Sequence, residues 1–234
     1  MTKSLGFFLA IVCLAAAGMA LPHTVPAAGS DTPCSLDQPP DVAGTEGPDT
    51  IRRSQVDDGD RVFTYGGDDK IAVAAESVTV CAGNGRDNVV ADTGAVSPRF
   101  FGEGGGDVVH AVDRRRAKYA TFDGGNGPDR VGGTNSPDLL RGGRGDDYLH
   151  GRAGKDAVYG GGGFDHLIGD EEGDLLIGGG YIDYLYGLGG PDRMHGGRGS
   201  DWLIGSEGED HANGDGNTDY CKAEYKNSCE RTFD

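Results

Sequence analysis

The sequence is poor in apolar residues and in positive charge. Hydrophobic residues make up only 36% of the 234 positions, so a thick core of the usual α/β type is hard to form. Lys and Arg number 21 against 38 Asp and Glu, a formal charge of -17, which argues against a nucleic-acid partner because few cations are available to neutralise phosphates. The 10 prolines do not accompany a glycine at every third position, which excludes collagen. The remaining classes are a disordered acidic chain and a repeat fold held together by cations.

The common catalytic motifs are also missing. The sequence contains no His-Glu-x-x-His, no Gly-x-Ser-x-Gly and no Ser-x-x-Lys, so zinc-protease, serine-hydrolase and lactamase chemistry lack their parts. We therefore predict that the protein is not an enzyme. A less favoured alternative is a β-solenoid polysaccharide lyase or epimerase, whose acid and base groups would come from Asp92, Asp113, Arg114 or Lys118.

Long hydrophobic runs are absent except at the N-terminus. Lys3 precedes an apolar stretch over residues 5–17, and small residues follow, with plausible cleavage points after Ala20 or Ala27. The stretch is too short for a comfortable transmembrane span. We predict that residues 1–27 are a signal peptide and that the mature protein is secreted and extracellular, with no transmembrane segment.

Four cysteines follow this signal: Cys34, Cys81, Cys221 and Cys229. In an extracellular chain they favour disulfides, and the lack of a Cys-x-x-Cys pair argues against zinc. Three connectivities are possible. We favour Cys221–Cys229, because a short loop after the last repeat would fasten a C-terminal cap over residues 223–234, and Cys34–Cys81 by elimination.

Glycine and aspartate are abundant, and in the second half of the chain they recur every nine residues. There are 44 glycines in all. A glycine stands five positions before each aspartate of the repeat, and a mostly apolar residue stands two positions after it. The aspartates of this series are Asp129, Asp138, Asp147, Asp156, Asp165, Asp174, Asp183, Asp192, Asp201, Asp210 and Asp219.

This pattern predicts an all-β fold, a parallel β-roll or β-solenoid with regular nine-residue half-coils over residues 124–222. Each unit supplies one short strand of about three residues and a six-residue turn, in which glycine adopts the positive φ angles that tight turns need. Two units make one coil, so the turns alternate between two sides. One side, the Asp129 column, carries Asp129, Asp147, Asp165, Asp183, Asp201 and Asp219. The other, the Asp138 column, carries Asp138, Asp156, Asp174, Asp192 and Asp210.

Such columns need counter-ions. Stacked coils lie ~4.8 Å apart, and two unit charges at that distance repel by roughly 1 kcal/mol in water and ~3.5 kcal/mol at an effective dielectric of 20. An ion midway between two layers lies ~2.4 Å from each, within the Ca–O range of about 2.3–2.6 Å and outside the Mg–O range of about 2.0–2.1 Å. The spacing therefore predicts bound Ca²⁺. Five gaps in the Asp129 column and four in the Asp138 column give about nine ions at most.

The turns resemble those of a known family. Residues 124–131 (Gly-Gly-Asn-Gly-Pro-Asp-Arg-Val) and 142–149 (Gly-Gly-Arg-Gly-Asp-Asp-Tyr-Leu) are similar to the RTX, or haemolysin-type, calcium-binding nonapeptide repeat. The resemblance implies a parallel β-roll with Ca²⁺ between same-side turns. It implies that the sixth-position aspartates and turn carbonyls hold the ions, the best-matching turns supplying Gly125, Gly127, Gly143, Gly145, Gly161, Gly163, Gly197 and Gly199.

Some units depart from the pattern. The fourth turn position is not glycine at Ser136, Glu172, Tyr181 and Asn217, and the second is not glycine at Thr134, Arg152, Asp170, Leu188, Ser206 and Asp215. We expect the second-position changes to be the milder ones. Because they fall mostly in the Asp138 column, we expect weaker binding there, and the weakest sites beside Glu172 and Tyr181.

The first half carries a degenerate form of the same repeat. Asp49, Asp69, Asp87 and Asp107 are spaced by 20, 18 and 20 residues, and 22 residues separate Asp107 from Asp129. We predict irregular coils of 18–22 residues over residues 28–123. Asp69 and Asp87, which keep the eighteen-residue offset, are the best calcium candidates of this half.

Two further hypotheses follow. Because each unit has one inward apolar residue, we expect the repeats to fold only when Ca²⁺ binds. Residues one after the aspartates, on one side, also form an outward aromatic strip that offers an alternative function as an extracellular adhesion module for a glycan or a cell-surface partner. The strip comprises Tyr148, His166, Tyr184, Trp202 and Tyr220, beside Ile168, Tyr186 and Ile204.

Overall fold

The structure is a computed structural model of the chain, and it describes residues 34, 39–92, 97–112, 119–227, 229 and 231–232. The chain divides into residues 1–32 and a second unit, residues 33–234. The predicted signal peptide lies outside the described residues, as do Asp113, Arg114 and Lys118, and Asp92 is described only in its backbone.

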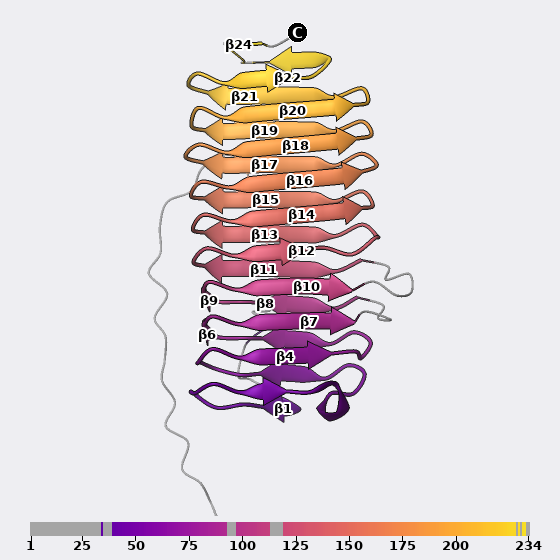
Figure 1. The fold of residues 1–234 in the computed structure, drawn as a ribbon, viewed down its shortest axis with the longest axis vertical. Helices are drawn as coiled ribbons and strands as arrows, with labels where there is room; N and C mark the ends of the chain where they lie inside the picture. The colour runs from indigo at the N-terminus through magenta and orange to yellow at the C-terminus, as the bar shows by residue number, and fades with distance from the viewer. Residues whose placement is uncertain are drawn as a thin grey trace, which may run out of the picture. The chain divides into compact units, whose positions relative to one another are not determined.

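The second unit is all β and winds as a parallel solenoid, which confirms the predicted fold class (Figure 1). Successive strands alternate between two parallel sheets, and each coil adds one strand to each sheet. The first sheet has thirteen strands: β1 (Val42–Ala43), β3 (Arg61–Phe63), β5 (Thr79–Cys81), β8 (Arg99–Phe101), β11 (Thr121–Asn126), β13 (Leu139–Arg144), β15 (Ala157–Gly162), β17 (Leu175–Gly180), β19 (Arg193–Arg198), β21 (His211–Gly216) and β23 (Tyr225–Asn227), with β6 (Asn84–Gly85) and β9 (Gly104–Gly105) beside this path.

The second sheet has eleven strands, and the only helix among the described residues is the 3-10 turn η1 (Arg53–Gln55). The strands of the second sheet are β2 (Thr50–Ile51), β4 (Lys70–Val73), β7 (Asn88–Asp92), β10 (Val108–Val112), β12 (Arg130–Gly132), β14 (Tyr148–Ala153), β16 (His166–Glu171), β18 (Tyr184–Gly189), β20 (Trp202–Glu207), β22 (Tyr220–Lys222) and β24 (Arg231–Thr232). Within the described part of the chain, no helix is long and apolar enough to cross a membrane.

The strand registers give the length of each coil. In the repeats Leu140 pairs with Val158, an offset of 18 residues. Upstream, Val80 pairs with Phe100 and Phe100 with Phe122, offsets of 20 and 22 residues. The predicted coil lengths of 18–22 residues are therefore confirmed. The regular strands are six residues long rather than three, because the first three turn positions also pair with neighbouring coils.

A narrow core runs along the solenoid axis between the two sheets. In every repeat the residue two positions after the aspartate is buried, as predicted; Leu140, Leu149 and Leu167 have no exposed surface. The upstream coils carry larger side chains, and the rings of Phe100 and Phe122 stack with centroids 5.2 Å apart.

The two predicted disulfides are present. Cys34 is bonded to Cys81, which fastens the start of the second unit to β5. Cys221 is bonded to Cys229 across a separation of 8 residues, just after the last repeat.

Candidate metal centre

Each aspartate column is a continuous ladder of hydrogen bonds between coils. The side chain of each aspartate accepts, through Oδ1, a hydrogen bond from the backbone N–H of the aspartate one coil earlier; Asp129 N–H donates to Asp147 at 2.8 Å, and Asp138 N–H to Asp156 at 2.8 Å. The same bond links Asp69 to Asp87, and Asp87 to Asp107, in the irregular coils. One carboxylate oxygen per rung is thus used to hold the stack together.

The second carboxylate oxygen is buried and has no protein partner. A buried acceptor without a donor costs free energy, so an array of them is a strong sign that another group belongs there. The aspartates whose Oδ2 atoms are unpaired and shielded from solvent in this way are Asp69, Asp87, Asp107, Asp129, Asp147, Asp156, Asp165, Asp174, Asp183, Asp192, Asp201, Asp210 and Asp219.

The first glycine of each turn leaves a space that this oxygen faces. A Cβ placed on Gly178 would lie 2.5 Å from Oδ2 of Asp183 and 2.7 Å from the carbonyl oxygen of Gly196 in the next coil. Two oxygens therefore converge on one point between successive layers, at distances close to those of Ca–O bonds. The corresponding pair of oxygens meets at Gly102, Gly124, Gly142, Gly151, Gly160, Gly169 and Gly196.

The second and fourth turn positions carry the positive φ angles that the glycines predict. Gly143 and Gly145 have φ of 114° and 127°, and the carbonyls of Gly125 and Gly127 point at them from the coil before. The other glycines implied as carbonyl ligands, Gly161, Gly163, Gly197 and Gly199, share this conformation. Their backbones therefore have the geometry that the resemblance implies.

Most non-glycine substitutions leave the turn unchanged. Glu172 and Tyr181 at the fourth position adopt φ of 77° and 82°, and Arg152 and Leu188 at the second adopt 81° and 75°. These L-residues take up a conformation that is uncommon for them, so the stacked neighbours enforce the turn. The backbone thus gives no reason to single out the sites beside Glu172 and Tyr181.

Burial makes these carboxylates reluctant to ionise on their own. It raises the pKa of Asp156 and of Asp183 to about 8; the backbone hydrogen bond opposes that shift, and neighbouring carboxylates add to it. Burial likewise raises the pKa of Asp147 and of Asp174 to about 7. A column with raised pKa values and unpaired oxygens has the electrostatics of a cation site without its cation.

The upstream candidates, Asp69 and Asp87, have a different setting. Both have unpaired Oδ2 atoms, but the first turn position is Thr64 or Ala82 instead of glycine. The Thr64 hydroxyl donates a hydrogen bond of 2.7 Å to the carbonyl of Ala82. In this gap a side chain therefore stands where the regular turns have open space.

Asp107 is a further candidate that we did not predict as a ligand. Its Oδ2 is unpaired, and the carbonyl of Gly124 faces it across Gly102. The signal was present in the sequence, because Gly102 stands five positions before Asp107. The offset of 22 residues to Asp129 hid it from the search for a nine-residue period.

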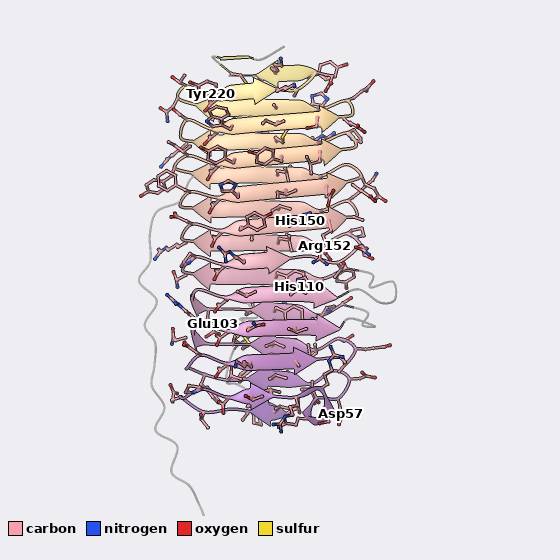
Figure 2. The ribbon with its side chains drawn as sticks, viewed as in Figure 1. Asp57, Glu103, His110, His150, Arg152 and Tyr220 are labelled. Carbon is pink, nitrogen blue, oxygen red and sulfur yellow. A yellow bond between two sulfur atoms is a disulfide. The ribbon has the colours of Figure 1, made fainter. Side chains whose placement is uncertain are left out.

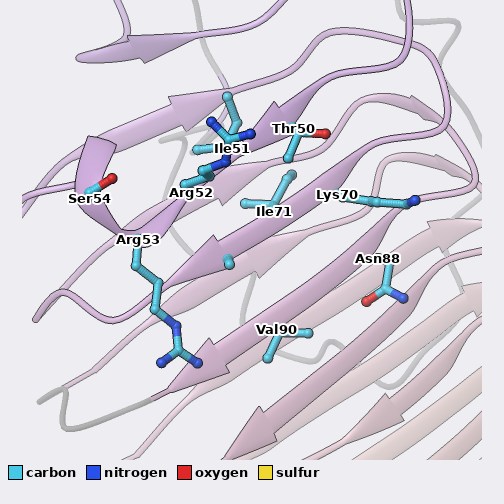
Figure 3. Close-up of a pocket in the computed structure, with 10 residues that line it drawn as sticks. Thr50, Ile51, Arg52, Arg53, Ser54, Lys70, Ile71, Asn88 and Val90 are labelled. Carbon is cyan, nitrogen blue, oxygen red and sulfur yellow. The ribbon is translucent and has the colours of Figure 1, made fainter.

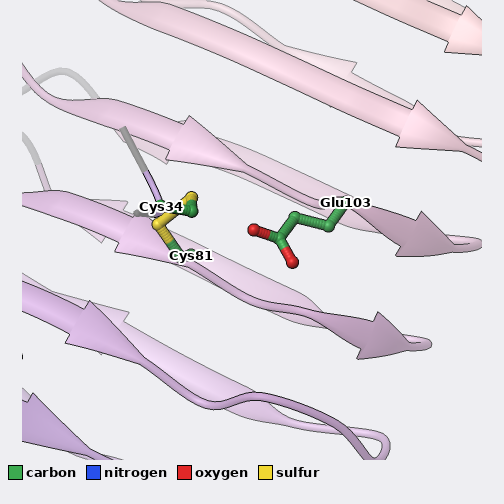
Figure 4. Close-up of side chains that lie close together, drawn as sticks. All are labelled: Cys34, Cys81 and Glu103. Carbon is green, nitrogen blue, oxygen red and sulfur yellow. A yellow bond between two sulfur atoms is a disulfide. The ribbon is translucent and has the colours of Figure 1, made fainter. Parts of the chain in front are cut away.

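Two other features carry less weight as sites. Cys34, Cys81 and Glu103 bring their ligand atoms within 4.8 Å of one another, but both sulfurs are in the disulfide, which removes them as thiolate ligands (Figure 4). A surface pocket of about 630 Å³ lies at the ends of β2, β4 and β7, where Arg52, Arg53 and Lys70 surround Ile51 (Figure 3).

The outer face of the second sheet carries the predicted aromatic strip. His166 stacks on Tyr184 with centroids 4.8 Å apart, and Trp202 on Tyr220 with centroids 4.5 Å apart (Figure 2). Tyr148 and His166, and Tyr184 and Trp202, stack at 6.4 and 6.0 Å. The rings therefore cover one another's faces, as cross-strand pairs that stabilise a sheet do.

Comparison with known proteins gives one match. The family model of the RTX calcium-binding nonapeptide repeat (4 copies) matches residues 132–167, 168–203 and 187–221. No curated protein and no solved structure matches the chain. The matched segment lies within the predicted repeat region and contains the paired columns described above. Residues 132–221 are therefore calcium-binding repeats of the RTX type, wound as a β-roll.

Proposed function

We propose that this calcium-binding repeat protein is secreted and non-catalytic, and that Ca²⁺ ions lie between successive turns of both columns. The observation that carries the proposal is the row of buried, unpaired Oδ2 atoms, most of which face a glycine carbonyl in the next coil. In each gap the ligands would be the aspartate Oδ2, the first-glycine carbonyl and carbonyls of the second and fourth turn positions.

Calcium suits this donor set. All the donors are oxygens, and carboxylates with backbone carbonyls in an adaptable arrangement are typical of Ca²⁺ sites, whereas Mg²⁺ demands a tight octahedron and keeps its waters. When bound, the ion supplies the positive charge and the Lewis-acid contact that the unpaired oxygens lack. The chain's own part is to hold those oxygens in register through the aspartate ladder.

We infer that ion binding is coupled to folding of the repeats. Each half-coil buries one sizeable apolar residue, and its glycines lose much backbone entropy on folding. The free energy of binding to a site that exists only in the folded state then becomes folding free energy. Far-UV circular dichroism should report a gain of β structure on addition of Ca²⁺ and no comparable gain with Mg²⁺.

A pair of neighbouring aspartates tests the ligand assignment. Asp147→Asn keeps an oxygen at Oδ1 for the ladder but replaces Oδ2 with an amide, so we expect calorimetry to find about one fewer Ca²⁺ and a weaker response. Asp146→Asn makes the same charge change at an exposed side chain whose Oδ1 accepts the Phe164 N–H, so it should leave the calcium count unchanged. Equal behaviour of the two variants would contradict the assignment.

Secretion rests on separate observations. Two disulfides form in the second unit, and disulfides persist in oxidising compartments. We expect the protein to be recovered from the culture medium of its native host, with a mature N-terminus near residue 21 or 28. An intact Met1 in the exported protein would contradict the predicted signal peptide.

Adhesion through the aromatic strip remains a second candidate. Tyr148, at 42% exposure, extends the strip into solvent, and the strip crosses five neighbouring strands. Its ring faces are engaged with one another, however, so mainly ring edges are left for a ligand. A glycan array with the Ca²⁺-loaded protein tests this role; a hit that disappears in Tyr184→Ala would support it.

A further inference from the structure

Two turns of the solenoid differ from all the other aspartate turns in sequence. Residues 44–49 read Gly-Thr-Glu-Gly-Pro-Asp, and residues 133–138 read Gly-Thr-Asn-Ser-Pro-Asp. Both have threonine in the second position and proline in the fifth. Threonine at that position was expected to be a mild change, but the contacts of Thr45 and Thr134 show a specific role.

In both turns the threonine satisfies the carboxylate oxygen that is unpaired elsewhere. The Thr134 N–H donates to Asp138 Oδ2 at 2.6 Å, and the Thr134 hydroxyl lies 3.0 Å from the same oxygen. Thr45 repeats both bonds: its N–H donates to Asp49 Oδ2 at 2.5 Å and its hydroxyl at 3.1 Å. Accordingly, Asp49 and Asp138 are missing from the buried unpaired carboxylates of the described residues.

The backbone of these turns also differs. Thr134, Ser136, Thr45 and Gly47 all lack the positive φ that the second and fourth positions have in the regular turns. The hydroxyl accepts the N–H of the fourth-position residue as well, at 3.2 Å for both Ser136 and Gly47. Threonine therefore closes a compact hydrogen-bonded loop around Oδ2, and it does so in the same way twice.

Their place in the fold is the same too. Asp49 belongs to the first coil and is the first rung of the column that continues through Asp69 and Asp129. Asp138 is the first rung of its own column, and its Oδ1 accepts the N–H of Ala120 from the irregular coil before. Each Gly-Thr-x-x-Pro-Asp turn thus stands at the base of a column, and the unpaired Oδ2 atoms begin with the next rung.

We propose that these two turns are metal-free caps, in which threonine N–H and hydroxyl groups replace the ion at the base of each column. The inference rests on the proposed function, because it concerns where the Ca²⁺ array begins. It assigns no ion to the gap between Asp138 and Asp156. The Asp138 column then has three ion-binding gaps instead of four, and residues 124–222 hold about eight ions, five plus three.

A cap of this kind gives the repeats a base that forms without calcium. The hydrogen bonds around Asp138 are made within six residues, and the rung is tied to Ala120 in the coil before. Ion-bound coils can then stack on a rung that already has the right register. The order of events in folding would start at residues 133–138 and proceed toward the C-terminus.

A sequence swap tests the proposal. Replacing Thr134→Gly together with Ser136→Gly makes residues 133–138 identical to residues 124–129, an ordinary turn. Native mass spectrometry in Ca²⁺-containing buffer should then count one ion more than in the wild type. Ser206→Gly, which restores glycine at the second position of a regular turn with φ of 83°, should leave the count unchanged, and so should Thr134→Ser, which keeps the hydroxyl.

The outcomes separate this inference from the proposed function. A wild-type chain that binds several ions, with no extra ion in the double variant, would overturn the caps alone. A wild-type chain that binds no Ca²⁺ would overturn the proposed function and the caps with it. As a second readout, amide exchange in chelator should leave residues 133–138 protected longer than residues 151–156, and equal exchange would also count against the caps.

Discussion

The irregular coils before residue 112 and the repeats after residue 124 share one winding but differ in what fills their turns. In the repeats the first turn position is always glycine, and an unpaired carboxylate faces the space beside it. In the irregular coils Thr64 and Ala82 put side-chain atoms there, and the Thr64 hydroxyl binds the carbonyl of Ala82. The irregular coils also have a stacked Phe100–Phe122 pair and a disulfide to β5.

The comparison teaches that the same parallel ladder can be held in two ways. Where side chains fill the turns and the core is thick, hydrophobic burial and internal hydrogen bonds hold the coil. Where glycine leaves the turn open and the core is one residue wide, the coil depends on a ligand for its charge balance. The two halves should therefore respond differently to anything that removes calcium.

The largest expected effect is regional unfolding in chelator. With EGTA we expect amide exchange over residues 142–219 to accelerate by about two orders of magnitude or more, while β3, β5 and β8 stay protected. Hydrogen exchange with mass spectrometry measures both regions in one sample. Mg²⁺ added at the same concentration as Ca²⁺ is the control and should not restore protection. Equal loss of protection in the two halves would contradict the comparison.

The next effect concerns the first turn position. Gly178→Ala places a Cβ 2.5 Å from Asp183 Oδ2, in the space assigned to an ion, so we expect about one fewer bound Ca²⁺ and a melting temperature lower by about 5 °C. Gly162→Ala is the matched control, since a Cβ there meets nothing within 4 Å. The reverse change, Ala82→Gly, opens the corresponding space in an irregular coil and should not lower the ion count. An unchanged ion count in Gly178→Ala would contradict this placement of the ion.

Acidification should partly replace calcium in the repeats. Burial raises the pKa of Asp147 to about 7 and of Asp183 to about 8, from 3.8. Between those values the metal-free folded state binds more protons than the unfolded state, so its stability falls as pH rises. We therefore expect more β structure in EGTA at pH 5.5 than at pH 7.5 by circular dichroism, and no such difference with Ca²⁺ at saturation. A metal-free fold that gains stability as pH rises would contradict it.

Much of the molecule could be predicted from the sequence because its period is uninterrupted. Asp129 to Asp219 fall into two columns with buried apolar residues between them, and the two disulfides follow from where the cysteines lie. Asp107 was missed because two loops change the coil length around it. The role of Thr134 was missed because a substituted second position usually keeps its φ, as Arg152 does, and only the hydrogen bonds to Asp138 reveal the exception.

The smallest effect separates the aromatic strip from both halves of the comparison. Tyr184 stacks between His166 and Trp202, and aromatic pairs contribute about 0.5–1.5 kcal/mol beyond burial, so Tyr184→Ala should lower the Ca²⁺-loaded stability by about 1–3 kcal/mol. The calcium count should not change, because the ring lies on the outer face of β18 and the ions are assigned to the turns. Tyr119→Ala, at 55% exposure, should be nearly neutral. Thermal unfolding with native mass spectrometry measures both quantities, and a lost ion in Tyr184→Ala would mean that the strip and the columns are coupled through the sheet.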